Sequence, residues 1–293
     1  MKKKLAIVSL SGICGGCETV LGVVIEKIEE LFDLVYAPMF VDSQDFSDAD
    51  VFIVIGPVET KEDVEILEKI RKLNKPVYAF GTCAAYGGIP GLINLYGLDE
   101  TVVEIYKNRT KSGLVPSRDV PKPLKFVDLV ANHVNVVSFI PGCPPLVDKV
   151  PEFLEAVAKG EKFVLPEKSV CDVCPLEKKG KSEITRILLI NEVDPNEIDW
   201  NRCLLEQGIL CMGPATRALC DAHCPQRRMP CFGCMGPISE KMDQGASALK
   251  AIASVLVNVD IEEIKKKLKD AVGLFYKFSL PSSILKHKWE DTK

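Results

Sequence analysis

The 293-residue sequence lacks the features of several protein classes. The best candidate for a long apolar run, residues 246–259, is interrupted by Lys250, so the sequence predicts no membrane-spanning helix. The 37 Lys and Arg residues do not outnumber the 41 Asp and Glu residues, and the net charge of -4 disfavours binding to a nucleic-acid backbone. Only three histidines are present, which leaves histidine a minor candidate as a metal ligand. No internal repeat occurs.

The first residues are also not expected to form a targeting signal. No twin-arginine leader is present, and the lysine-rich start leads through apolar residues 5–10 directly into Cys14-Gly-Gly-Cys17. Cleavage after such an apolar run would remove or separate this pair of cysteines, so residues 5–10 are better explained as a first β-strand. We therefore expect a cytoplasmic protein.

Cysteine, in contrast, is unusually frequent, with twelve residues. A secreted disulfide scaffold is normally much shorter than this chain. Moreover, eight of the cysteines follow residue 170, whereas the first 140 residues have the pattern of a self-sufficient α/β domain. The cysteines are therefore candidate metal ligands.

Residues 4–160 alternate between strand-like apolar runs and segments with helical spacing. Strands are predicted at residues 5–10, 34–40, 51–55, 77–80 and 134–140, and helices at residues 18–32, 61–73 and 147–158. Buried strands joined by helical crossovers are typical of a doubly wound parallel sheet, so the fold class is α/β. The stretch at 108–125 is expected to be a surface excursion, whereas the Gly-rich residues 86–97 either cover a buried site or face a partner.

The composition changes near residue 165, and at about 100–200 residues per domain we expect two domains, 1–165 and 166–293. From residue 170 to 236 the chain is rich in Cys, Pro and Gly and has little periodicity. Such a stretch cannot build an ordinary hydrophobic core, so bound metal clusters are the best candidates for ordering it. The last residues, 282–293, are expected to be loosely held.

The first four cysteines each follow a predicted parallel strand. Because loops at the carboxyl ends of such strands converge on one crevice, these residues can share one ligand, and they are Cys14, Cys17, Cys83 and Cys143. An iron-sulfur cluster suits this arrangement, with Gly15 and Gly16 allowing backbone N–H groups to approach inorganic sulfide. A zinc knuckle or a redox dithiol is the alternative for the first pair taken alone.

The other eight cysteines read C171-x2-C174-x28-C203-x7-C211-x8-C220-x3-C224-x6-C231-x2-C234. Their spacing is compatible with two structural zinc sites. Twelve cysteines in three sets of four suit three cubane clusters. The spacing alone leaves both alternatives open.

Five motifs give the chain a resemblance to the small, electron-transfer subunit of [NiFe] hydrogenases over essentially its whole length. They are Cys14-Gly-Gly-Cys17-Glu18, Gly81-Thr82-Cys83, Pro141-Gly-Cys143-Pro-Pro145, Cys203-Leu-Leu-Glu-Gln-Gly-Ile-Leu-Cys211-Met-Gly-Pro214 and Pro230-Cys-Phe-Gly-Cys234. The chain is similar in particular to the cytoplasmic methanogen-type class, in which the hydrogenase does not reduce deazaflavin.

The resemblance implies a flavodoxin-like domain followed by an irregular Cys-rich iron-sulfur domain, with three [4Fe-4S] clusters. The proximal cluster would be held by Cys14, Cys17, Cys83 and Cys143, the medial one by Cys220, Cys224, Cys231 and Cys234, and the distal one by Cys171, Cys174, Cys203 and Cys211. Exported relatives carry a histidine in place of Cys171 and a proline in place of Cys224. All-thiolate ligation implies low cluster potentials, because thiolate carries a charge that neutral imidazole lacks.

The implied function is a relay of electrons from H2 oxidation at a NiFe site on a separate large subunit to a partner redox subunit. That partner would carry iron-sulfur or flavin groups and could belong to a heterodisulfide reductase complex. No catalytic residue is expected on this chain; Glu18 is a candidate for proton exit and equally for a carboxylate that stabilises a helix start. The alternatives are a related subunit of a nickel-free oxidoreductase complex and a zinc-stabilised interaction protein.

Overall fold

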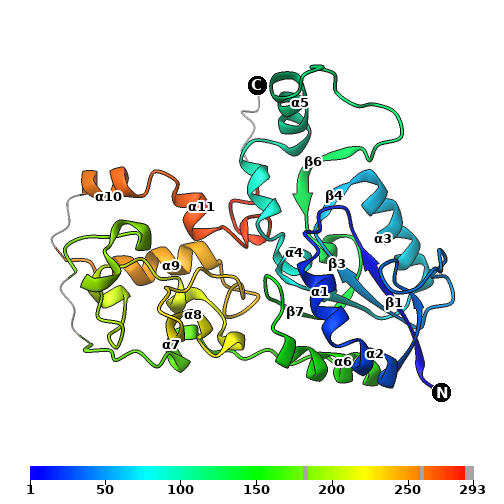
Figure 1. Cartoon of the computed structure of the whole chain (residues 1–293), viewed down its shortest axis with the longest axis horizontal. Coiled ribbons are helices and arrows are strands. Elements are labelled where there is room, and N and C mark those ends of the chain that lie inside the picture. Colours follow the sequence, from blue (N-terminus) through cyan, green and yellow to red (C-terminus); the bar gives the residue numbers. More distant parts are fainter. Residues whose placement is uncertain (181–183, 258–260, 288–293) are drawn as a thin grey trace. The chain divides into compact units, whose positions relative to one another are not determined.

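The computed structural model describes residues 1–180, 184–257 and 261–287 and divides into two compact units. Met1–Val164, together with the segment from Phe278 onward, forms the first unit, and Leu165–Lys277 forms the second. Figure 1 shows the named strands gathered in the first unit and short helices and loops in the second.

Five parallel strands form the main sheet of the first unit. They are β1 (Lys3–Ser9), β2 (Phe32–Tyr36), β3 (Val51–Ile55), β5 (Val77–Phe80) and β7 (Val136–Ile140). Their order, β2-β1-β3-β5-β7, reverses the direction of winding at β1, which is the flavodoxin-like doubly wound arrangement. The fold class predicted from the sequence is thus confirmed.

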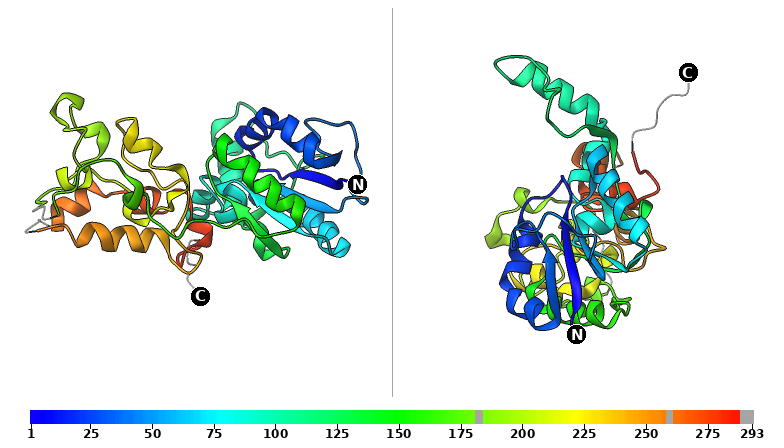
Figure 2. Two further views of the ribbon diagram at one scale, coloured as in Figure 1. Left: turned by 90° about the horizontal axis from the view of Figure 1, so that it is seen from below. Right: turned by 90° about the vertical axis from the view of Figure 1, so that its right-hand side faces the viewer.

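Helices cover both faces of this sheet. They are α1 (Gly16–Val23), α2 (Ile25–Leu31), α3 (Lys61–Leu73), α4 (Thr82–Tyr86) and α6 (Val150–Lys159). Helices α2 and α6 pack against one another, as Figure 2 shows, and Phe153 of α6 meets the rings of Tyr78 and Phe80 at 6.1 and 5.9 Å. Leu67 and Ile70 of α3 are buried with the alternate strand residues of the opposite face. Burial on both faces explains why the strands are nearly continuous apolar runs.

Two predicted elements differ in their bounds. The helix expected at 18–32 is divided at Val24, whose φ of −106° and ψ of 21° are not helical; the neighbouring Gly22, Val23 and Ile25 have low helix propensity. The strand expected at 34–40 is β2, which ends at Tyr36 before Pro38. A two-stranded antiparallel pair of β4 (Val58–Thr60) and β6 (Pro123–Asp128) was not predicted.

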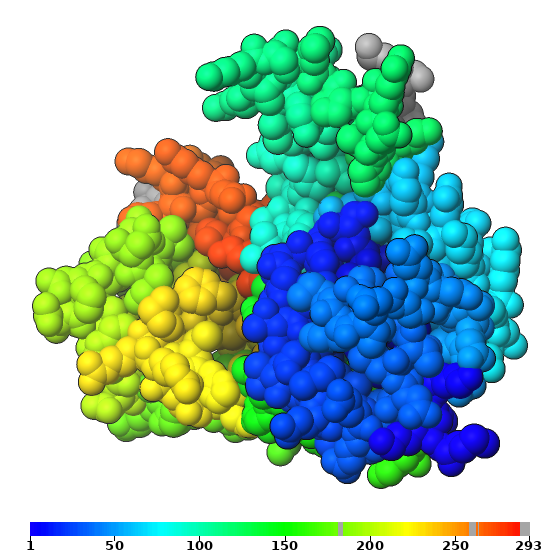
Figure 3. Space-filling model, turned by 45° about the vertical axis from the view of Figure 1, so that its right-hand side comes forward, coloured from blue at the N-terminus to red at the C-terminus, as the bar shows by residue number. Residues whose placement is uncertain are grey.

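The surface excursion expected at 108–125 is confirmed for residues 108–122, which follow from the end of helix α5 (Leu98–Arg109), whereas residues 123–125 begin β6. No residue of α5 is buried, and the segment after it is almost entirely exposed. Figure 3 shows this part of the chain standing clear of its neighbours.

The Gly-rich residues 86–97 pack against the C-terminal segment. Short 3₁₀ helices η1 (Pro90–Leu95) and η9 (Leu280–Ser282) are in contact, and a Cβ atom on Gly87 or Gly91 would lie 2.3 or 2.4 Å from Pro281 Cγ. The amide of Asn94 donates to Lys286 O at 3.1 Å. The expectation of a loosely held end is therefore wrong for residues 282–287; residues 288–293 lie outside the described part of the chain.

The second unit has a small apolar core of Ile198, Leu204 and Ile209, with Leu176 and Trp200 packed against it. Isolated β-bridges, such as Glu177 with Arg202, replace strands in its described residues. Its α-helices are α7 (Val170–Val173), α8 (His223–Gln226), α9 (Gln244–Ala253), α10 (Ile261–Lys267) and α11 (Ala271–Phe275). Its 3₁₀ helices are η4 (Ile190–Glu192), η5 (Pro195–Glu197), η6 (Leu205–Gln207), η7 (Gly213–Ala215) and η8 (Ala218–Cys220).

Candidate functional site: three sets of cysteines

The first set lies at the carboxyl edge of the sheet. Cys14 and Cys17 flank the start of α1 after β1, Cys83 lies in α4 directly after β5, and Cys143 follows β7. Cys17 interacts electrostatically with the other three thiols, and Cys83 interacts with Cys14 and Cys143. The structure therefore brings together four residues that the sequence separates by more than a hundred positions.

Thr82 joins the two loops that carry Cys83 and Cys143. Its backbone N–H donates to Gly142 O at 2.9 Å, and its Oγ1 accepts from the N–H of Gly142 at 2.8 Å. The N–H of Gly81 also donates to Ile140 O at 2.8 Å. These bonds fix the ends of β5 and β7 beside one another, so Thr82 is a positioning residue. Its place in the Gly81-Thr82-Cys83 motif alone does not reveal this role.

Asp63 holds the loop that precedes Cys14. Its carboxylate, 1% exposed, accepts from the N–H and the hydroxyl of Ser11, both at 2.9 Å, and from the N–H groups of Glu59 and Thr60 at 3.0 and 2.9 Å. Thr60 accepts in return from the N–H of Asp63, which completes a capping box at the start of α3. One buried side chain thus connects the loops after β1 and β3.

An Asp63→Asn variant is expected to unfold at a lower temperature, because the amide offers one acceptor oxygen where the carboxylate offers two. Leaving buried donors unpaired costs about 1–3 kcal/mol. Each kcal/mol corresponds to about 2–4 °C in the unfolding midpoint of a domain of this size. Calorimetry at a fixed scan rate measures the change; the exposed Glu65→Gln on the same helix is the control. Equal midpoints for the two variants would contradict this role of Asp63.

Glycines leave space over two of the thiols. A Cβ atom on Gly81 would lie 2.6 Å from Cys17 Sγ, and one on Gly88 would lie 2.4 Å from Cys83 Sγ. Both glycines also have positive φ, 90° and 61°, which any other residue adopts only with strain. The absence of a Cβ atom at these two glycines therefore lets the backbone lie directly against the sulfur atoms. Such close approach suits a site in which backbone N–H groups surround a cluster.

Burial makes these thiols poor nucleophiles. It raises the pKa of Cys17 far above its usual range and that of Cys83 to about 12, with the neighbouring thiols adding to both shifts. Burial, and then the charge of Asp63, raises the pKa of Glu59 to about 7, so a titratable carboxyl also lies near Cys83. Reactive cysteines have lowered pKa values. A bound metal would supply the positive charge that stabilises the thiolate forms, and its binding would release protons.

Glu18 is buried in the first turn of α1, with 3% of its surface exposed. Its Oε1 accepts a hydrogen bond from the hydroxyl of Ser9 at 2.7 Å. The position favours a carboxylate that interacts with the helix dipole. Proton exit through Glu18, next to Cys17 in the sequence, stays a prediction.

The second set shares a single cavity. Cys171, Cys174, Cys203 and Cys211 all line this small cavity. Cys171 interacts electrostatically with the other three, and a Cβ on Gly213 would lie 3.1 Å from Cys171 Sγ. Most of the other lining residues are apolar, among them Val170, Leu204 and Pro214. This is the ligand set predicted for a distal cluster, gathered around one space.

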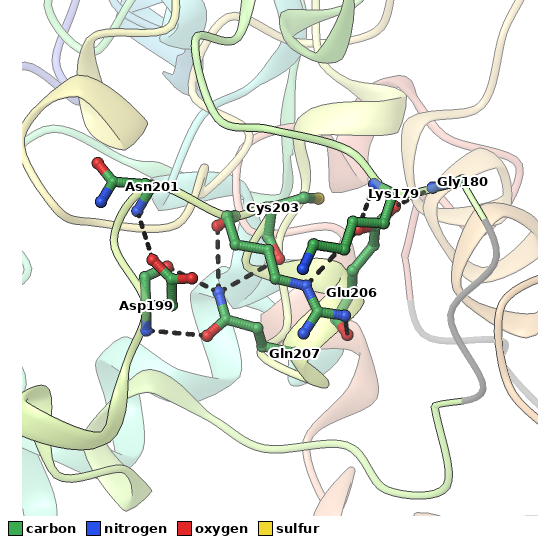
Figure 4. Close-up of polar contacts among 8 residues, drawn as sticks. Lys179, Gly180, Asp199, Asn201, Cys203, Glu206 and Gln207 are labelled. Atoms are coloured by element: carbon green, nitrogen blue, oxygen red, sulfur yellow. Dashed lines mark hydrogen bonds and ion pairs between the residues drawn. The ribbon is translucent and has the colours of Figure 1, made fainter.

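A network of polar contacts positions Cys203 (Figure 4). The Gln207 amide nitrogen donates to the carbonyls of Asp199 at 2.9 Å and Cys203 at 3.4 Å, and its oxygen accepts from the N–H of Asp199 at 3.0 Å. The N–H of Cys203 donates to Glu177 O at 2.8 Å. Glu206 and Gln207 both lie within the predicted Cys203–Cys211 motif. Their hydrogen bonds give these two polar residues of the motif a structural role that does not involve binding metal.

The third set falls into two pairs by its electrostatic interactions. Burial raises the pKa of both Cys224 and Cys231; Cys220 adds to this rise in Cys224, and Cys234 adds to it in Cys231. The pKa of Cys231 is also raised by Cys211 of the second set. The N–H of Cys231 donates to Cys211 Sγ at 3.2 Å, and its carbonyl accepts from the N–H of Met212 at 2.9 Å. The structure therefore joins the third set directly to the second.

The donor chemistry of these sets fits iron-sulfur clusters. Burial raises the pKa of Cys171 to about 12, that of Cys211 to about 11, and that of Cys231 well above its usual range. Within the described residues, no three His, Cys, Asp or Glu side chains converge closely enough to hold a single metal ion. A cubane cluster makes no such demand, because each of its irons takes one protein thiolate.

Comparison with known proteins relates the whole chain to hydrogenase subunits. It is 36% identical to the G subunit of the F420-non-reducing hydrogenase from Methanothermobacter thermautotrophicus, with 98% of this chain and 97% of that protein covered. It is also 36% identical to the vhu G subunit of the F420-non-reducing hydrogenase from Methanocaldococcus jannaschii, with 97% of each covered. The sulfhydrogenase 2 subunit delta of Pyrococcus furiosus is 29% identical over 91% of this chain and 98% of its own.

Two further matches cover a smaller part of the chain. Residues 14–157, which include the first set of cysteines, match the family described as the 20 Kd subunit of NADH ubiquinone oxidoreductase. A crystal structure of an NAD+-reducing [NiFe]-hydrogenase in the H2-reduced state has a chain that aligns with a TM-score of 0.51 at 25% identity, covering 57% of this chain and 96% of that one. In the described residues, no helix is long and apolar enough to cross a membrane.

Proposed function

The chain belongs to the family of F420-non-reducing hydrogenase G subunits and is a subunit of an oxidoreductase complex, and on that premise we propose that it is the electron-transfer small subunit of a [NiFe] hydrogenase. When bound, three [4Fe-4S] clusters supply one-electron steps between a NiFe site on a large subunit and a partner redox subunit. The proposal includes a cytoplasmic location, as expected from the sequence.

The cavity lined by Cys171, Cys174, Cys203 and Cys211 is the single strongest support for this function. Three segments of the chain place four thiols around one mostly apolar space, an arrangement that suits the ligands of a shared metal cluster. The gathered Cys14, Cys17, Cys83 and Cys143 give independent support at the sheet edge. The hydrogen bond from Cys231 to Cys211 supports a medial set that adjoins the distal one.

The partners follow from the same proposal. The large subunit would cover the proximal set, beside which Ile13 and Ile89 are 37% and 47% exposed. The relatives are named as hydrogenases that do not reduce F420, which favours delivery to an iron-sulfur or flavin subunit, such as one of a heterodisulfide reductase complex. Their organisms favour a role in the anaerobic metabolism of methanogens.

Metal analysis of the purified chain tests the cluster content. We expect about twelve irons and twelve acid-labile sulfides per chain, since each cubane uses four thiolates. A brown colour under anaerobic conditions should accompany them. About two zinc ions per chain with little iron would overturn the three-cluster proposal in favour of a zinc-stabilised interaction protein, whose thiolate sites are colourless.

The match of residues 14–157 to a family named for NADH ubiquinone oxidoreductase favours one second candidate. In that case the chain transfers electrons in a complex whose large subunit holds no nickel. Nickel analysis of the copurified complex distinguishes the two functions: about one nickel per large subunit supports the hydrogenase, and its absence from active complex supports the second candidate.

A further inference from the structure

Lys178 is the charged residue at the cavity of the second cysteine set. Among the residues that line this cavity, it alone has an ordinarily charged side chain; the rest are the four cysteines, apolar residues, a glycine and prolines. Lys178 Nζ donates to the carbonyl oxygen of Cys171 at 2.5 Å. Its positive charge opposes the rise that burial and Cys211 cause in the pKa of the Cys171 thiol.

The backbone around Lys178 is held on both sides. The N–H groups of Lys179 and Gly180 donate to the carboxylate of Glu206 at 2.9 and 3.0 Å, as Figure 4 shows. On the other side, Glu177 accepts from the N–H of Cys203 and donates to Asn201 O, both at 2.8 Å. The backbone of Lys178 is therefore held by the same segment that positions a predicted cluster ligand, and the bond to Cys171 O places its ammonium.

Among the residues that the structure describes, the charge of Lys178 is also not taken up by an ion pair. In the part of the chain that the structure describes, none of the ion pairs involves Lys178. Its charge contributes to the lowered pKa of Asp172, but hydrogen bonds from Ser169 are the main cause of that shift. Its charge therefore remains available to act on Cys171 and on whatever the cavity contains. Solvent weakens the field of this charge, because the side chain is exposed.

We propose that Lys178 tunes the distal site, making a cluster bound by Cys171, Cys174, Cys203 and Cys211 easier to reduce; this rests on the proposed function. Reduction adds one negative charge to a site that four thiolates already make strongly negative. A fixed cation beside Cys171 stabilises the reduced state more than the oxidised one. The ammonium of Lys178 thereby offsets part of the free-energy cost of a buried thiolate at position 171. It acts through its charge and does not bind the cluster itself.

The test is a redox titration of the intact complex, followed by electron paramagnetic resonance, for wild type, Lys178→Met, Lys178→Arg and Lys179→Met. In wild type we expect three one-electron waves from this chain. Lys178→Met should lower the midpoint potential of one wave. At a fixed applied potential, the ratio of reduced to oxidised cluster for that wave should then fall by about three- to tenfold. A tenfold change equals 59 mV for one electron. Lys178→Arg keeps the charge and should leave that wave in place, as should Lys179→Met.

Each other outcome has a definite meaning. Unmoved waves in Lys178→Met with full iron content, or an equal shift in Lys178→Arg or Lys179→Met, would overturn the tuning role and leave the three-cluster function intact. Fewer than three waves in wild type, with the iron content low, would instead refute the proposed function itself. A wave that moves with the charge at position 178 supports the inference.

Discussion

A Cys231→Ala variant of the intact complex is expected to lose H2-dependent reduction of its acceptor by at least about 100-fold, the upper end of what loss of a mere supporting residue costs at a metal site. Alanine removes one of four thiolates from the proposed medial set, which the remaining three can complete only imperfectly. Hydrogen/deuterium exchange should persist, because on the proposed function it takes place at the NiFe site of the large subunit.

The structure shows why this change should be confined to the medial set. Cys231 supplies its backbone N–H to Cys211 Sγ and its carbonyl to the N–H of Met212, and alanine retains both groups. The second cysteine set therefore keeps its hydrogen bond. Only the thiol of Cys231 is lost from the site. This residue is 7% exposed, and its thiol is hydrogen-bonded to Thr216.

Exchange activity and acceptor reduction are to be measured on the same preparation, with iron content and the number of redox waves as the check on cluster loss. Met229→Leu is the matched control, since this residue lies two positions away and is 39% exposed. Full acceptor reduction by a Cys231→Ala complex that demonstrably lacks the medial cluster would refute a linear relay. Loss of exchange as well would indicate that the variant complex failed to assemble.

The parallel sheet could be predicted because its strands are buried on both faces. A continuous apolar run such as Val51–Ile55 followed by Gly56-Pro57 is typical of a buried strand in a chain with helical segments between such runs. The β4–β6 pair was missed for the opposite reason. It joins three residues after β3 to six residues that follow a long excursion, and neither run has a distinctive pattern of its own.

Cysteines at strand ends were predictable because topology, rather than fine packing, brings the carboxyl ends of parallel strands together. The residues that hold those loops, or that lie beside the second cysteine set, were not. Asp63 has the pattern of an ordinary helix-capping residue, and Lys178 that of one charge in a solvated Lys-Lys pair. The role of Asp63 depends on its contact with Ser11, and the proposed role of Lys178 depends on its contact with Cys171. Only the folded chain establishes these contacts.

Gly81→Ala is expected to empty the proximal site, lowering the iron content by about four per chain if a cubane is lost. Gly81 has φ 90° and ψ 159°, a conformation that is essentially restricted to glycine and costs other residues about 1–3 kcal/mol. The new Cβ would also lie 2.6 Å from Cys17 Sγ, closer than van der Waals contact allows. Either Cys17 or the loop that Thr82 fixes to Gly142 has to move, and both carry or position ligands.

Gly97→Ala separates the effect of backbone strain from that of the thiol. Gly97 has a similar φ of 92°, but a Cβ there would meet its nearest atoms, in Glu100 and Asp99, only at 3.6–3.7 Å. We expect this control to lower the unfolding temperature while keeping its full iron content. Because the distal and medial sets lie in the second unit, Gly81→Ala should retain about eight irons, those of two cubanes, and their redox waves. A Gly81→Ala chain with as much iron as Gly97→Ala would show that the first cysteine set does not hold a cluster against this backbone.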